Sequence, residues 1–355
     1  MTNVIQLNAP SYRQSDATRL SHLIDSFACH RRMRDDVFWL KENAELLNIL
    51  ECSGVSLPGQ ALEIHEEFYA TIEKRISFFP QYYRFLLSVC LDLEALGMPG
   101  NKGQRLVDWA VSQGVADAEL SDLQRGEARR LMARRGVDPL PRDTGLHDRM
   151  RGFCARAATF ALPNKKAAYE LTHTVFYLSE YGRRDPQMAE GTARSLDYAG
   201  TLAFLEQNAD LLAEICVAMR FAGLTPPREW EGWLSREMRY FDVAYGDQAP
   251  AQDNYHEYLV GNWALAARGR AAFTARTKAG RMGFINAGRG VGPLRDMSES
   301  LYRMADTRSA DWAQMRPRVI TGMSDEAHQL LVAAEAGSAD FEGFFANFAR
   351  CGLSH

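Results

Sequence analysis

Apolar residues recur at steps of three and four positions along nearly the whole chain. This spacing puts apolar side chains on one face of an α-helix, where neighbouring helices can bury them. No run of alternating β-branched residues bounded by hairpin turns indicates a strand. The pattern predicts helices over residues 17–52, 61–76, 81–97, 103–113, 119–134, 145–161, 165–181, 189–222, 228–244, 254–276, 296–305, 309–315, 324–336 and 339–350.

Three of the expected helices end with the same chemistry. In the segments 39–59, 86–100 and 204–227, a glycine follows the helical stretch and a proline comes within four positions of it. Glycine tolerates the left-handed conformation that closes a helix, and proline cannot continue one. The chain is therefore expected to fold as helical hairpins, which stack into bundles, solenoids or closed α/α toroids.

The segment 39–59 is echoed by 204–227, 165 positions later. The best matches are Leu40 with Leu205, Asn43 with Asn208, and Glu45 with Asp210. One echo at long range favours a two-half arrangement over a tandem array of short repeats. We predict an all-α fold of helical hairpins in an α/α toroid-like or irregular bundle arrangement. Residues 1–355 would form a single all-α unit, within which two pseudo-repeated halves would span about 1–140 and 145–355.

Composition narrows the class of protein. The chain has 355 residues, of which 46% are hydrophobic and 24% charged, so there is enough apolar material for a large core. The net charge of −4 disfavours a nucleic-acid binder. No apolar run is long enough to span a membrane, and the N-terminus has no secretory pattern. Six scattered cysteines without a CxxC fit a reducing compartment, so we expect a cytoplasmic protein.

Two short stretches carry the clearest chemistry. Glu170 precedes His173 by three positions, and Asp253 precedes His256 by the same interval. Positions i and i+3 share a helix face, and bundle proteins use this spacing to aim a carboxylate and an imidazole at one metal ion. Such ligands suit iron, manganese or zinc. The spacing predicts a metal site built from these four residues. Further carboxylates for it could come from Glu66, Glu67, Asp197 or Glu257.

The same four residues can also be interpreted as catalytic groups without a metal, or as structural residues. His173 and His256 could act without a metal as the general acid and base of a catalytic site. In a structural role, His173 would be a core histidine bonded to Glu170. Asp253 would then only cap the helix expected to begin at Tyr255.

A basic segment follows the second pair. Residues 258–295 hold seven basic side chains and no acid, and they end in a glycine-rich loop, 286–293. Arg289 with the backbone of Gly288 and Gly290 could hold an anionic cofactor or substrate. A surface loop beside a basic helix would have the same sequence pattern. The arginine clusters at 129–130 and 134–135 are interpreted as solvated faces or helix C-terminal charges.

The stretches DDVFWLKENAELLNILECSG, YELTHTVFYLSEYG and DNYHEYLVGNW resemble an uncharacterised, all-helical family of bacterial proteins. The resemblance implies a bacterial, soluble, helical protein, and it brings no established activity. No catalytic residue is carried over from it.

We therefore expect a metal-dependent enzyme that acts on a small anionic substrate in a cavity between helices. The rival hypothesis is a non-catalytic helical scaffold or binding protein for a protein or peptide partner. A third is a regulator that binds a small anion. Substrate, reaction type and oligomeric state do not follow from the sequence.

Overall fold

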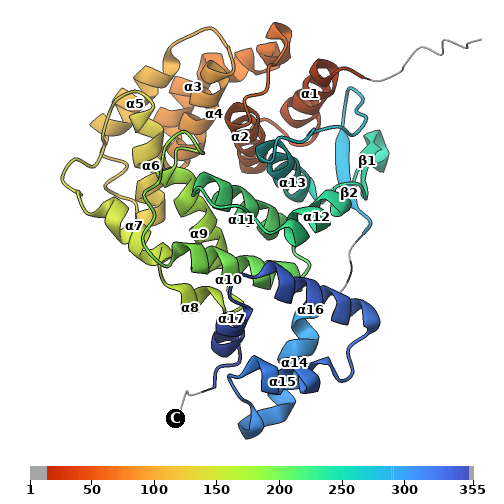
Figure 1. The fold of residues 1–355 in the computed structure, drawn as a ribbon. Helices are drawn as coiled ribbons and strands as arrows, with labels where there is room; N and C mark the ends of the chain where they lie inside the picture. The colour runs from red at the N-terminus through yellow and green to blue at the C-terminus, as the bar shows by residue number, and fades with distance from the viewer. Residues whose placement is uncertain (1–13, 251, 289, 291, 352–355) are drawn as a thin grey trace, which may run out of the picture.

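The computed structural model describes residues 14–250, 252–288, 290 and 292–351. Within them the chain forms seventeen α-helices and one two-stranded sheet, so the predicted all-α class is confirmed (Figure 1). The expected helices match those observed, except where one expected segment is divided in two or ends early. The closed toroid stays a prediction.

The first helices run from one end of the upper body in Figure 1 to its centre. They are α1 (Asp16–Asp25), α2 (Val37–Cys52), α3 (Glu66–Phe78), α4 (Tyr83–Ala95), α5 (Lys102–Ser112) and α6 (Asp122–Ala133). The expected helix over 17–52 is interrupted between α1 and α2 by a π-helical turn, Ser26–His30.

The middle of the chain completes the upper body. Its helices are α7 (Leu146–Cys154), α8 (Ala157–Phe160), α9 (Lys165–Leu178), α10 (Thr192–Leu205), α11 (Ala209–Phe221), α12 (Arg228–Glu237) and α13 (Tyr255–Ala267). Asn164 and Asn208 begin α9 and α11 by accepting a hydrogen bond from a backbone N–H three residues on. These asparagine caps fix where the two helices start.

The last helices form a smaller lobe below the upper body in Figure 1. They are α14 (Leu294–Met304), α15 (Trp312–Ile320), α16 (Asp325–Gly337) and α17 (Phe341–Phe348). Helix α16 packs on α10 and α12, and α17 packs on α10. The buried apolar residues form one continuous cluster from Leu20 in α1 to Ala349 after α17.

The sheet corrects two expectations. The helix expected over 228–244 ends at Glu237, and β1 (Phe241–Tyr245) follows it. Residues 280–293, whose glycines predict a loop, contain β2 (Met282–Asn286). This strand pairs antiparallel with β1, with Phe241 opposite Asn286. The helix expected over 254–276 also ends early, at Ala267. Apolar residues at 241, 243 and 245 had the two-residue period of a strand, but its partner lies too far along the chain to be recognised locally.

The two copies of the sequence echo lie in α2 and α11, but they differ in local structure. Asn43 lies inside α2, where its amide donates to the carbonyls of Phe27 and Trp39. Its counterpart Asn208 caps the start of α11. The division into two pseudo-repeated halves stays a prediction.

A buried charge network ties the N-terminal helices to α13 and the sheet. The guanidinium of Arg31 donates two hydrogen bonds to Asp253, at 2.7 and 2.9 Å, and one to Glu42 at 2.8 Å. The side chains of Arg31 and Asp253 are only 6% and 2% exposed. Burial alone would lower the pKa of Arg31, but hydrogen bonding to Asp253 and the two carboxylate charges raise it. Asp253 also accepts from the backbone N–H of Phe284 in β2, so the network joins three parts of the chain.

We expect Asp253→Ala to lower the free energy of unfolding by about 3 kcal/mol, because removing one partner leaves a buried charge incompletely compensated. Urea denaturation measures this change. The matched control is Glu299→Ala, which breaks a pair with Arg295 whose side chains are 48% and 80% exposed. That variant should change stability by less than about 0.5 kcal/mol. Equal effects of the two variants would contradict a structural role for the buried pair.

Candidate functional site

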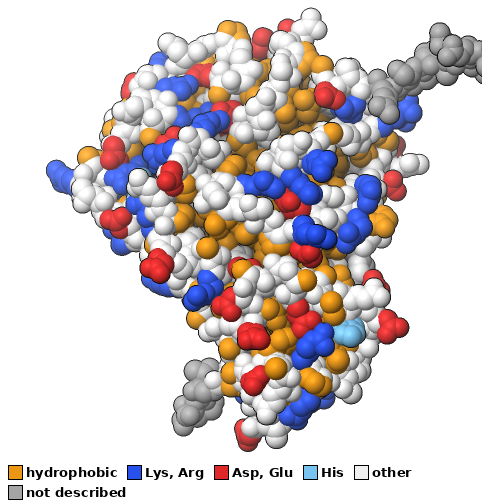
Figure 2. All heavy atoms as spheres, in the orientation of Figure 1, with side chains coloured by type: hydrophobic (Ala, Val, Ile, Leu, Met, Phe, Trp, Pro, Cys, Tyr) orange, Lys and Arg blue, Asp and Glu red, His pale blue; other side chains and the backbone are white. Residues whose placement is uncertain are grey.

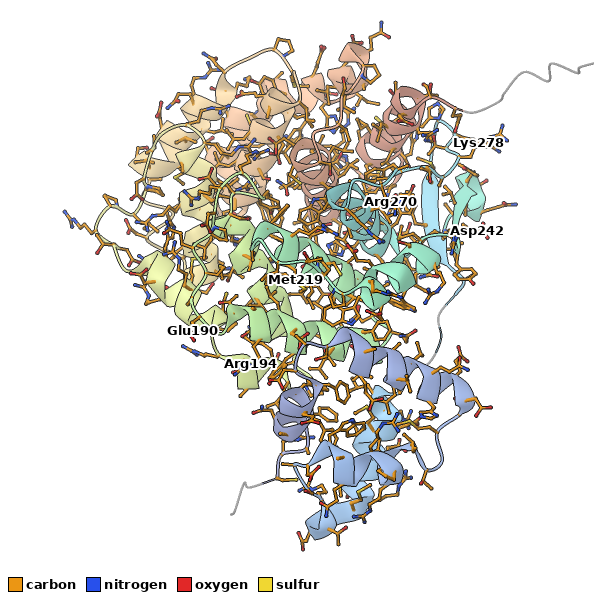
Figure 3. The ribbon with its side chains drawn as sticks, viewed as in Figure 1. Glu190, Arg194, Met219, Asp242, Arg270 and Lys278 are labelled. Carbon is orange, nitrogen blue, oxygen red and sulfur yellow. The ribbon has the colours of Figure 1, made fainter. Side chains whose placement is uncertain are left out.

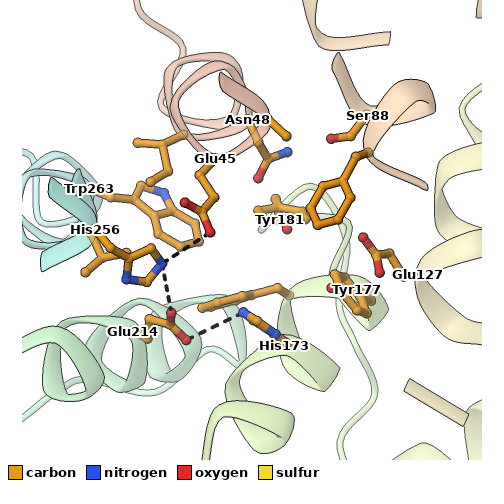
Figure 4. Close-up of a pocket in the computed structure, with 15 residues that line it drawn as sticks. Glu45, Asn48, Ser88, Glu127, His173, Tyr177, Tyr181, Glu214, His256 and Trp263 are labelled. Carbon is orange, nitrogen blue, oxygen red and sulfur yellow. Dashed lines mark ion pairs between the residues drawn. The ribbon is translucent and has the colours of Figure 1, made fainter. Parts of the chain in front are cut away.

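A cavity of about 160 Å³ lies at the centre of the upper body, between α2, α4, α6, α9, α11 and α13 (Figure 4). One part of its wall is aromatic, and the other carries ionisable groups. The aromatic residues are Phe85, Phe176, Tyr177, Tyr181 and Trp263. The ionisable residues are Glu45, Glu127, His173, Glu214 and His256.

Glu214 of α11 lies between the two histidines that the sequence singled out. Its Oε2 is 3.8 Å from Nε2 of His173 on α9, and its Oε1 is 4.0 Å from Nε2 of His256 on α13. The Glu214 side chain is only 3% exposed. The structure thus brings His173 and His256 together across one buried carboxyl group.

His256 is held on its other side by a second carboxylate. Its Nδ1 is 2.7 Å from Oδ1 of Asp210, whose Oδ2 accepts a hydrogen bond from the Tyr169 hydroxyl. Burial alone would lower the pKa of His256, but the hydrogen bond and charge of Asp210, with the charges of Glu45 and Glu214, raise it to about 10. The imidazole of His256 is therefore a cation at neutral pH.

Glu214 has the opposite character. Burial raises its pKa to about 7, with the charges of Asp210 and Glu45 adding to this, although nearby His256 acts against it. Half of the Glu214 side chains are then protonated near neutral pH, whereas an exposed glutamate would be fully ionised.

The contacts of Thr172 fit both protonation states of Glu214, and a hydrogen bond donated by Thr172 acts to lower the pKa of that carboxyl group. The Thr172 hydroxyl lies 2.9 Å from the carbonyl oxygen of Tyr169 and 2.6 Å from Oε2 of Glu214. A hydroxyl has one hydrogen and can donate to only one of these oxygens. When it donates to the carbonyl, the contact with Glu214 is a hydrogen bond only if the carboxyl group carries the proton and donates it.

His173 completes the set as a neutral base. Although 39% of its side chain faces the cavity, it lies deep in the protein, and burial lowers its pKa. Its ring stacks on Tyr177, with 5.9 Å between the centroids. The cavity thus combines a half-protonated acid, a neutral imidazole and an imidazolium. Glu214 lies within 4.0 Å of a ring nitrogen of each histidine.

The two acids of the acid-x-x-His pairs lie elsewhere. Glu170 lines a different cavity, beside Arg149 and Arg156. Asp253 binds Arg31, and its Oδ1 also lies 3.4 Å from the backbone N of Tyr255 at the start of α13. In the described ranges, no group of three or more His, Cys, Asp and Glu side chains is arranged to hold a metal ion. The four predicted ligands are therefore not assembled in this structure, and of them only His173 and His256 meet.

The structure describes only part of the predicted anion loop, and Arg289 lies outside the described residues. Gly288 donates its backbone N–H to the side chain of Asn286, and Gly290 is exposed. Lys and Arg side chains gather on the upper right of the face in Figure 2, and exposed Arg270 and Lys278 lie on that side in Figure 3. None of the described residues of the loop 286–293 lines the central cavity.

The sequence reasoning missed Glu214 and the partners of His256. Glu214 was visible as a lone acid in the apolar run LLAEICVAM, an environment that raises the cost of a charge. Glu45 and Asp210 were already paired by the echo, and both face His256, at 3.9 Å from Nε2 and 2.7 Å from Nδ1. The echo thus marked two functional candidates without showing what they contact.

The described chain is an all-α protein with an ionisable cavity enclosed by its helices. It matches the family described as Domain of unknown function (DUF6902) over residues 1–351, and it belongs to that family. This confirms the resemblance to an uncharacterised family. No curated protein and no solved structure matches the chain. Among the described helices, none has the length and apolar character needed to cross a membrane.

We expect Glu214→Gln to stabilise the protein increasingly as the pH rises from 5 to 8. Folding raises the pKa of Glu214 from 4.5 to about 7. The folded state therefore binds more protons than the unfolded chain between these values. This contribution is full below pH 4.5 and is lost as the pH rises through 7. Glutamine mimics the protonated form at every pH, so the variant escapes the loss.

Thermal unfolding of both proteins at several pH values measures the effect, which should reach several degrees at pH 8. Glu190→Gln is the control, because Glu190 is exposed in a loop (Figure 3). Its Tm relative to wild type should not depend on pH. A pH-independent difference for Glu214→Gln as well would show that Glu214 is ionised in the folded protein throughout this range.

Proposed function

We propose that this protein is an enzyme that transfers protons on a small, neutral, hydroxyl-bearing ring bound in the central cavity. Glu214 is the general acid and His173 the general base. The observation that carries the proposal is the position of Glu214 between a neutral and a cationic imidazole.

The protonation states suit this chemistry. A general acid or base works best when its pKa is close to the working pH, and the pKa of Glu214 is about 7. Glu214 would donate its proton to a substrate oxygen, and Nε2 of His173 would take a proton from the substrate. The cationic His256 would then stabilise the negative charge left on Glu214. The separation of 3.8 Å between Glu214 and His173 is longer than a hydrogen bond. Glu214 therefore does not pass its proton directly to His173, and both groups remain available to a substrate.

The walls favour a neutral polar ring. Aromatic faces pack on the flat sides of a ring, and carboxylates accept from its hydroxyl groups. Asn48 is 8% exposed and lines the cavity, and its amide nitrogen has no hydrogen-bond partner among the described residues. A ligand hydroxyl could accept from it. The volume of about 160 Å³ resembles the ~150 Å³ of a cavity that admits benzene.

A metal-dependent version is the second candidate, with iron, manganese or zinc. It is favoured by the Asp210–His256 hydrogen bond, because metal-binding histidines commonly donate their other ring N–H to a carboxylate. The anionic substrate expected from the loop at Arg289 also stays a prediction. A cytoplasmic location is supported by six cysteines that are all free.

Proton transfer can be detected without knowing the product. Pooled aldoses and ketoses are incubated with the protein in D₂O, and proton NMR follows the loss of C–H signals. We expect wild type to catalyse exchange, and Glu214→Gln and His173→Ala to slow it at least ~100-fold. Glu190→Gln should retain the wild-type rate. Exchange by Glu214→Gln at the wild-type rate would refute the proposed acid. No exchange, together with stable capture of a defined protein or peptide, would favour the scaffold hypothesis.

Chelation separates the two versions of the enzyme. After dialysis against EDTA, the acid–base function predicts an unchanged exchange rate. A loss of more than tenfold that iron, manganese or zinc restores would support the metal-dependent version instead. Metal analysis of His173→Ala and His256→Ala would then show whether both histidines bind the ion.

A further inference from the structure

A second cavity lies beside the first, enclosed by α6, α7, the loop after α6 and the end of α9. Its volume is about 330 Å³. Its wall is rich in basic groups, and Tyr177 separates it from the central cavity, because this residue lines both. The polar residues used below are Arg129, Arg130, Asp138, His147, Glu180 and Arg184.

Arg130 is the unusual member of this wall. The sequence pattern here indicates a solvated face or helix C-terminal charges. Arg130 does lie in the last turn of α6, but it is not solvated, because it is only 5% exposed. Its Nε and Nη2 are buried without a hydrogen-bond partner, and its guanidinium makes no ion pair within the described residues. It lies 4.3 Å from the centroid of the Tyr181 ring, a cation–π contact that holds the group in place.

The other charges of this cavity are already matched. Arg129 pairs with Asp138 at 2.9 Å, and Arg184 pairs with Glu180 at 2.9 Å. His147 has its pKa lowered by burial and then by the charges of Arg129 and Arg184, so it stays neutral at neutral pH. The cavity is therefore left with one uncompensated positive charge, that of Arg130.

Asp92 and Glu51, whose charges act on the same Cys52 thiol as Arg130, are also engaged. Asp92 pairs with Arg134 at 2.5 Å, and Glu51 pairs with Arg183 at 2.5 Å. A buried, unpaired cation is unfavourable. A fold that compensates its other buried charges but leaves this one facing a cavity is arranged for an anion from outside the chain.

We propose that the second cavity binds a small oxyanion, a carboxylate or a phosphate, through Arg130. The guanidinium can donate a charge-assisted hydrogen bond to an oxygen of such a group and hold its charge. His147, which makes no hydrogen bond to another described residue, can donate another. Apolar neighbours, among them Met150 and Leu178, would contact an organic part of the ligand. This site does not depend on the acid–base chemistry of the central cavity.

Calorimetric titration with inorganic phosphate and with benzoate tests the site. We expect wild type to bind at least one of them and to show a higher Tm in its presence. Arg130→Met should weaken binding at least tenfold and abolish the rise in Tm. Without ligand, this variant should melt no lower than wild type, because an apolar side chain replaces an unpaired buried charge.

Arg105→Met is the matched control, because Arg105 on α5 carries the same charge in an exposed pair with Glu73 on α3. It should bind as wild type does, and so a general charge effect is excluded. His147→Gln tests the cavity with a residue that is only half-buried and should weaken binding without unfolding the protein. Absence of heat with both anions, or binding that survives both Arg130→Met and His147→Gln, would overturn the proposal.

Discussion

The hydrogen bond between Asp210 and His256 sets the electrostatics of the whole central cavity. It joins α11 to α13, the two helices that pack most extensively on each other, and it keeps His256 cationic despite burial. Burial raises the pKa of Glu214, and the negative charges of Asp210 and Glu45 add to this rise. Burial also lowers the pKa of His173. The different protonation states of the three neighbouring groups thus follow from burial together with this one short contact.

The compensation of buried charge also distinguishes two arginines elsewhere in the fold. Arg31 donates hydrogen bonds to two carboxylates and a carbonyl, and it packs on aromatic rings. These contacts hold distant parts of the chain together. Arg130 receives an aromatic face and no carboxylate. Both arginines have largely buried side chains, but within the described residues only Arg31 is paired with carboxylates. Arg31 therefore holds the fold together, whereas Arg130 is left to face a cavity.

The sequence predicted most of the helices and, of the central site, the two histidines His173 and His256. Helical periodicity is local, so the helices were predictable within a few residues, whereas pairing of β1 with β2 depends on contacts far apart in the chain. The shared acid-x-x-His spacing in two helical stretches indicates that His173 and His256 could meet. Glu170 shares a helix with His173 but faces another cavity, since neighbouring faces of one helix can serve different sites. Glu214 could not be assigned, because its role depends on how α9, α11 and α13 cross.

The single hydrogen of the Thr172 hydroxyl links the protonation state of Glu214 to hydrogen bonding within the α9 backbone. While Glu214 is protonated, that hydrogen can stay on the carbonyl of Tyr169, one turn earlier in α9. When Glu214 ionises, the hydroxyl must turn to it and release the carbonyl. Each proton that leaves Glu214 therefore costs one hydrogen bond within α9 and reverses the direction of the one between α9 and α11. The helix that presents His173 and Tyr177 is in this way directly sensitive to the proton count of its neighbour.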